Sequence, residues 1–146
     1  ESRVGPLAVL AGVTGEQHGL GLACLDQVLR DQGWSVANLG PDVPPVDLAR
    51  FLARNHADLL ALSASLPDRE SAVRDAVAAA RAGRADPRLA IMLGGALAAD
   101  PAVADRLDVD FVADSLVAAA GFARIVADRL PGSDPDQEPA WADSAG

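Results

Sequence analysis

The sequence contains no lysine, and all twelve of its basic residues are arginines. This absence excludes mechanisms that require a lysine, such as a Walker-type phosphate clamp, a Schiff base or the lysine of a phospho-receiver domain. Tyrosine is also absent, and only 3% of the residues are aromatic. Because a flavodoxin usually stacks its flavin between aromatic rings, this scarcity argues against a flavin site.

Cysteine, positive charge and long apolar runs are scarce as well. Cys24 is the only cysteine, which excludes a disulfide framework and a cysteine-based zinc site, and we expect a reduced, cytoplasmic setting. The formal net charge of −9 at pH 7 disfavours contact with DNA or RNA, which requires a basic face. No apolar run is long enough for a membrane span. Residue 1 is Glu1 rather than methionine, which fits a fragment, a processed chain or a trimmed chain.

Short apolar runs alternate with helical patterns along the chain. The runs predict strands at residues 7–13, 35–39, 59–63, 89–93 and 109–112. Helical spacing of apolar residues between the runs, and after the last, indicates a parallel sheet covered on both faces. We therefore predict an α/β fold over residues 1–130, with a flavodoxin-like (Rossmann-like), doubly wound, five-stranded sheet in three layers. Residues 131–146 are rich in Pro, Asp, Ser and Gly and are predicted to form a flexible acidic tail.

The loop after the first predicted strand contains His18. In an open parallel sheet, ligands bind beyond the carboxyl ends of the strands, where the strand order reverses. Imidazole is a good ligand for cobalt and other borderline metals, and Glu16 can accept a hydrogen bond from the second ring nitrogen. Glycines at positions 15, 19 and 21 allow a planar group to approach the backbone. Taken alone, the pattern fits a solvent-bonded loop histidine at least as well.

Other polar and glycine residues follow the later strands, and each has two interpretations. Ser63 and Ser65 can bind a ligand or cap the next helix, although Asp68 is already placed to start that helix. The pair Gly94 and Gly95 fits either a flat ligand or a tight turn.

Together, three segments resemble the cobalamin-binding domain family. They are residues 16–21 after the first strand, residues 63–65 after the third, and the glycine pair after the fourth. The match covers roughly residues 7–130. Glu16 stands where the family usually has aspartate, and Ser65 where leucine is more usual. Residues 15–21, 39–44 and 62–64 look most like the cobalamin-dependent photoreceptor repressors, the MerR-type regulators of carotenoid genes.

The resemblance implies a cofactor, adenosylcobalamin or methylcobalamin, with His18 as the lower axial ligand of cobalt and Glu16 as its orienting partner. It implies that Ser63 bonds the buried nucleotide tail of the vitamin, that Gly21, Gly94 and Gly95 leave space for this tail, and that Asp42 and Val43 line the corrin rim. The cofactor-binding residues implied in this way are Glu16, Gln17, His18, Gly21, Asp42, Val43, Ser63, Ser65, Gly94 and Gly95. The expected partner is a helical cap or effector domain over the upper corrin face, and a homo-oligomer is left open.

Three functions remain, in decreasing order of preference. The first is a light-sensing or cobalamin-sensing module of a regulator, which needs no catalytic residues of its own. The second is a part of an enzyme, either a corrinoid carrier for methyl transfer or the small cobalamin-binding subunit of a mutase. The third is a flavodoxin or phospho-receiver protein. A receiver needs a lysine and an aspartate after the third strand, where this chain has Ser63.

Overall fold

The computed structural model describes residues 5–65, 67–82, 89–95, 100 and 102–131, and its centre is a five-stranded parallel sheet. The strands are β1 (Leu7–Gly12), β2 (Ser35–Asn38), β3 (Leu59–Ser63), β4 (Ala90–Gly94) and β5 (Phe111–Val112). Their order in the sheet is β2-β1-β3-β4-β5, which is the flavodoxin-like order. The predicted fold class is therefore confirmed.

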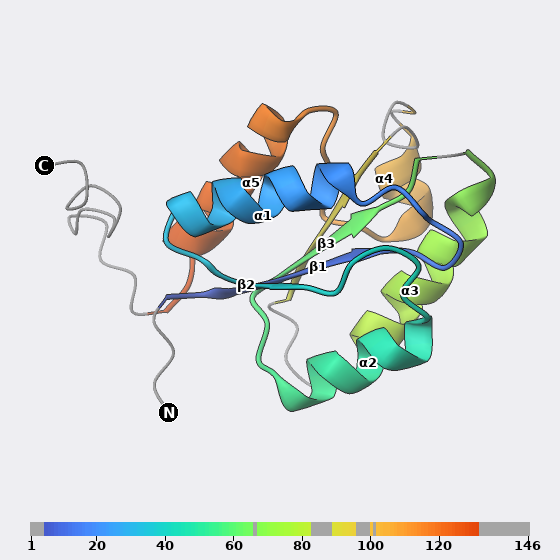
Figure 1. Cartoon of the computed structure of the whole chain (residues 1–146), viewed down its shortest axis with the longest axis horizontal. Coiled ribbons are helices and arrows are strands. Elements are labelled where there is room, and N and C mark those ends of the chain that lie inside the picture. Colours follow the sequence, from blue (N-terminus) through green and yellow to red (C-terminus); the bar gives the residue numbers. More distant parts are fainter. Residues whose placement is uncertain (1–4, 66, 83–88, 96–99, 101, 132–146) are drawn as a thin grey trace, which may run out of the picture.

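Helices cover both faces of the sheet, as Figure 1 shows. One face carries α1 (Leu20–Asp31) and α5 (Leu116–Asp128), and the other carries α2 (Pro45–Arg54), α3 (Glu70–Ala82) and the short α4 (Val103–Leu107). Along β1, Ala8 and Leu10 pack toward α1 and α5, whereas Val9 packs toward α2 and α3. Because each face is covered, β1 is buried along its whole length, which explains its uninterrupted apolar run.

Some predicted boundaries differ from the observed ones. The first strand ends at Gly12 rather than at Val13, and the last covers only Phe111–Val112. The last strand is shorter because Asp108, directly after α4, adopts a φ of +56°, and Val109 follows it in irregular backbone. The helix predicted from Asp68 begins as a 3-10 turn, η1 (Pro67–Arg69), before α3. Apart from Pro131, the predicted tail lies outside the described residues and stays a prediction.

The carboxyl ends of the three central strands lie side by side. Gly12 at the end of β1 pairs with Ser63 at the end of β3, which in turn pairs with Gly94 at the end of β4. The chain places β2 on one side of β1 and β3 on the other, so the strand order reverses between β1 and β3. Ligand sites in such sheets lie at this reversal. None of the described helices is both long and apolar enough to cross a membrane.

Candidate functional site: the His18 loop

The loop between β1 and α1 separates two side chains that are close in sequence. Gly15 adopts a φ of +85°, a backbone conformation that favours glycine, and the N–H of Glu16 donates to the carbonyl of Val13 at 2.9 Å. After this turn, Glu16 is only 1% exposed, whereas the side chain of His18 is 74% exposed. The loop thus buries a carboxylate directly behind an accessible imidazole.

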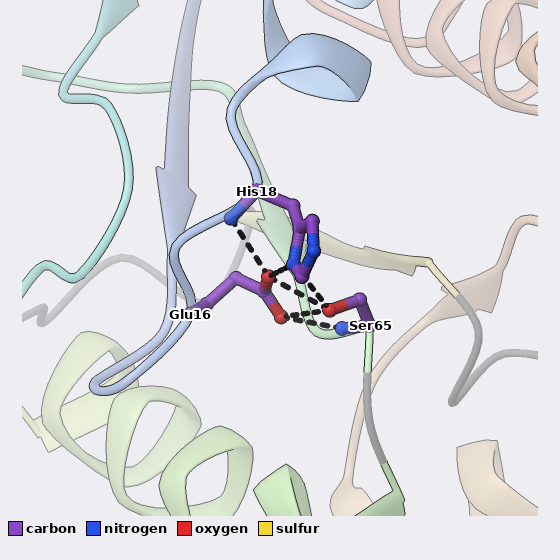
Figure 2. Close-up of polar contacts among 3 residues, drawn as sticks. All are labelled: Glu16, His18 and Ser65. Carbon is purple, nitrogen blue, oxygen red and sulfur yellow. Dashed lines mark hydrogen bonds and ion pairs between the residues drawn. The ribbon is translucent and has the colours of Figure 1, made fainter.

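The carboxylate of Glu16 accepts hydrogen bonds from two neighbours (Figure 2). Its Oε1 lies 3.0 Å from the backbone nitrogen of His18 and 2.8 Å from Nδ1 of the same residue. The Oγ of Ser65 lies 2.8 Å from Oε1 and 2.9 Å from Oε2, and the backbone N–H of Ser65 also donates to Oε2. Among the described residues, Glu16 is the only polar or charged residue in the buried class, and these donors offset its desolvation.

The charge on Glu16 determines which nitrogen of His18 is free. Burial alone raises the pKa of Glu16, but the hydrogen bonds from Ser65 and His18 outweigh it and lower the pKa from 4.5 to about 2. The carboxylate is therefore ionised at neutral pH and can only accept hydrogen bonds. The Nδ1 that faces it must carry the hydrogen, so in the neutral ring Nε2 holds the lone pair. A carboxylate orients metal-binding histidines in this way.

Ser65 reaches this cluster from the segment after β3, which lies next to β1. Its backbone N–H and its hydroxyl both donate to Glu16, and its Oγ lies 3.0 Å from Nδ1 of His18. The sequence suggested either a ligand contact or a helix cap for this serine. In the structure, the backbone N–H and the hydroxyl of Ser65 both bond to Glu16. This serine therefore holds in place the carboxylate that contacts the ring of His18.

Gly94 is the last residue of β4, and Gly95, directly after it, lies against the segment after β3. Gly95 has a φ of +99°, and a Cβ at this position would lie 2.4 Å from the carbonyl oxygen of Ala64. Gly94, by contrast, has no atom closer than 4.0 Å to such a Cβ. Position 95 therefore requires glycine because of its backbone conformation and this close approach, whereas a Cβ on Gly94 would meet no clash. Ser63 is half-buried in the same row, and its carbonyl accepts from the N–H of Val13.

The remaining predicted residues lie in different surroundings. Gln17 is exposed in the loop, and Gly21, in the first turn of α1, has no atom within 4 Å of a Cβ built on it. Val43 is only 8% exposed and belongs to the core on the α2 and α3 face. Asp42 is exposed, and its Oδ1 accepts from the N–H of Gly15 at 2.7 Å. No pattern in the sequence predicted this contact between Asp42 and Gly15. The predicted positions of Asp42 and Val43 at a corrin rim stay predictions.

Comparisons with known proteins agree with the predicted family. The family model described as B12 binding domain matches residues 6–121. The dimethylamine corrinoid protein 3 of Methanosarcina acetivorans is 28% identical over 112 residues, which cover 77% of this chain and 52% of that protein. The chain thus spans about half the length of this curated relative. These findings do not confirm the predicted closeness to photoreceptor repressors, because the curated relative is a corrinoid protein.

Solved structures share the fold. A cobalamin-binding protein from Desulfitobacterium hafniense has a TM-score of 0.75 and 22% identity, covering 84% of this chain and 59% of that one. The methanol:cobalamin methyltransferase complex of Methanosarcina barkeri has a TM-score of 0.78 and 16% identity, covering 89% of this chain and 49% of that one. At such identities the likeness shows the fold alone. The match of the family model to residues 6–121 goes further, and the chain belongs to the B12 binding domain family.

Proposed function

We propose that this chain binds a corrinoid and that His18 is the lower axial ligand of its cobalt. The contact between Glu16 and Nδ1 of His18 carries this proposal, because it leaves the lone pair of Nε2 available to a metal on an exposed ring. A single imidazole fits a cobalt ion whose equatorial ligands come from a macrocycle. When bound, the corrinoid supplies a cobalt centre that accepts and releases an alkyl group.

The residues around His18 have different proposed roles in binding the corrinoid. Glu16 fixes the tautomer and the orientation of the ring, and Ser65 holds Glu16 in place. A Cβ on Gly21 would meet open space and one on Gly94 would lie 4.0 Å from the Ala113 carbonyl oxygen, so neither position is closed, which suits their proposed place beside the nucleotide tail of the vitamin. Ser63, half-buried between β1 and β4, is the proposed hydrogen-bonding residue for this tail.

For the role of the bound corrinoid, we favour a carrier in methyl transfer, with methylcobalamin as the loaded form. This choice is supported by the relative named dimethylamine corrinoid protein and by the similar fold found in a methanol:cobalamin methyltransferase complex. A methyltransferase chain would then be the partner over the upper face of the corrin. The second candidate is the sensory module, supported by the resemblance of residues 15–21 and 39–44 to photoreceptor repressors.

An absorption titration tests the binding proposal. The purified chain is mixed with cobalamin, and the change from the base-on spectrum to the histidine-bound spectrum is followed. We expect wild type to show this change and His18→Ala to lack it, because no other side chain takes the place of the ring. His56→Ala is the matched control, since His56 follows α2 at the opposite edge of the sheet. A His18→Ala variant with the wild-type spectrum would refute the ligand assignment.

A second measurement separates the two roles. The chain is loaded with methylcobalamin in the dark and divided between a sample with a thiol acceptor and a sample under green light. A carrier transfers its methyl group to the thiol and keeps its oligomeric state in the light. A sensor instead loses the cobalt–carbon bond rapidly on illumination and changes its oligomeric state.

A further inference from the structure

The geometry points to Asp42 as the positioning residue that holds the His18 loop in its ligand-ready form. This inference rests on the proposed function. Asp42 lies in the turn between β2 and α2, 27 residues from Gly15 along the chain, and is exposed. Its Oδ1 accepts from the N–H of Gly15 at 2.7 Å, directly before Glu16. Asp42 does not touch His18, and it acts through the loop.

The turn that carries Asp42 is fixed to the end of β1 by backbone contacts. The N–H of Gly12 donates to the carbonyl of Gly40 at 2.9 Å, and the N–H of Val43 donates to the carbonyl of Gly12 at 2.9 Å. A Cβ on Gly12 would lie 3.0 Å from the Cα of Pro41 and 3.3 Å from the Cγ of Glu16. Gly12 therefore lets the turn, the strand end and the orienting glutamate lie in direct contact.

The conformation of Asp42 suits this task. Its φ of +56° lies in the left-handed region, which aspartate and asparagine tolerate better than other residues with a side chain. This backbone conformation accompanies a carboxylate that meets the amide of Gly15, which itself has a φ of +85°. Two turns with left-handed backbone conformations are thereby joined by one hydrogen bond. Release of that bond would free the segment that directs Glu16 inward and His18 outward.

Three variants distinguish the effect of the Asp42 hydrogen bond from the effects of the turn conformation and of the negative charge. Asp42→Gly keeps the left-handed turn and removes the acceptor, whereas Asp42→Asn keeps an acceptor oxygen and removes the charge. Asp47→Asn is the matched control, because Asp47 lines the same surface groove as Asp42 and its side chain is 57% exposed. That groove, of about 370 Å³, is lined by Leu39, Pro41, Asp42, Val43, Pro44, Asp47 and Phe51.

The first readout is hydrogen exchange at the Gly15 amide in the protein without cofactor, measured by NMR. The second is the dissociation constant of cobalamin together with the fraction in the histidine-bound spectrum. We expect Asp42→Gly to speed the exchange and to weaken histidine-bound uptake, each by about five-fold, the factor for one typical hydrogen bond. Asp42→Asn should lie close to wild type in both readouts, and Asp47→Asn should match wild type.

An Asp42→Gly variant with wild-type exchange at Gly15 would overturn the inference, as would faster exchange with unchanged cobalamin binding. Equal losses in Asp42→Asn and Asp42→Gly would also overturn it, because they would assign the effect to charge rather than to the hydrogen bond. A wild-type chain that takes up no cobalamin overturns the proposed function instead. In that case the exchange rates alone decide whether Asp42 holds the loop.

Discussion

Replacement of Glu16 by glutamine tests the physical basis of the site without any cofactor. The side chain is 1% exposed and receives donors from Ser65 and His18. Glutamine has nearly the same shape, but its amide nitrogen is a donor and would face another donor in this cluster. We therefore expect Glu16→Gln to fold and to be less stable than wild type.

The magnitude follows from the pKa of Glu16. A pKa lowered from 4.5 to about 2 corresponds to at most about 3 kcal/mol of stability at neutral pH. Glutamine keeps some of the hydrogen bonds, so we expect a loss of about 2 kcal/mol, within the range for hydrogen bonds to charged groups. Because the folded-state pKa lies below the ordinary value, this stabilisation is present above pH 4.5 and is lost as the pH falls toward 2.

The assay is urea unfolding of the protein without cofactor, followed by circular dichroism at several pH values. The stability difference between wild type and Glu16→Gln should be constant near neutral pH and should shrink once the pH drops below 4.5. Asp47→Asn, which removes an exposed charge, should stay within about 0.5 kcal/mol of wild type. Equal stability of Glu16→Gln and wild type at neutral pH, or a difference unaffected by acid, would refute the reasoning.

Two glycine substitutions give opposite patterns of stability and binding. Gly95→Ala should destabilise the protein without cofactor by about 2 kcal/mol or more in urea unfolding, because it adds a Cβ 2.4 Å from the Ala64 carbonyl oxygen at a φ of +99°. Unchanged stability would contradict this close approach. Gly21→Ala should leave this stability unchanged or slightly raised, as should the helical control Gly121→Ala, because both sites are open. Only Gly21→Ala should raise the dissociation constant of cobalamin, and equal affinity in both variants would remove Gly21 from the proposed tail path.

The strands were predictable because the sheet is covered on both faces. In β1 and β3 nearly every residue is buried, so each strand reads as an apolar run bounded by glycine or polar residues. β5 was predicted too long because Val109 is buried like a strand residue, at 8% exposure, although it lies in irregular backbone after α4. Burial governs the sequence pattern, whereas hydrogen bonding defines the strand, and the two differ at this edge of the sheet.

The candidate site was predictable where its partners are close in sequence. Glu16 and His18 lie two residues apart in one loop, and their contact is present as expected. The contact of Ser65 with Glu16 spans 49 residues and depends on the pairing of β1 with β3. A serine after a strand is equally suited to a cap, a ligand contact or this role. The bond from Gly15 to Asp42 depends on left-handed backbone conformations at both residues. The conformation at position 42 was not predictable, because the residue there is not glycine.

The contacts around His18 bear on how a ligand would bind. Glu16 and Ser65 restrict the ring of His18 through hydrogen bonds within the chain, which lowers the entropy lost when the ring coordinates a ligand. A preorganised ligand of this kind binds more tightly than the same imidazole on a free loop. Glu16→Gln and Asp42→Gly should therefore weaken cobalamin uptake while leaving Nε2 of His18 in place, which distinguishes loss of orientation from loss of the ligand in His18→Ala.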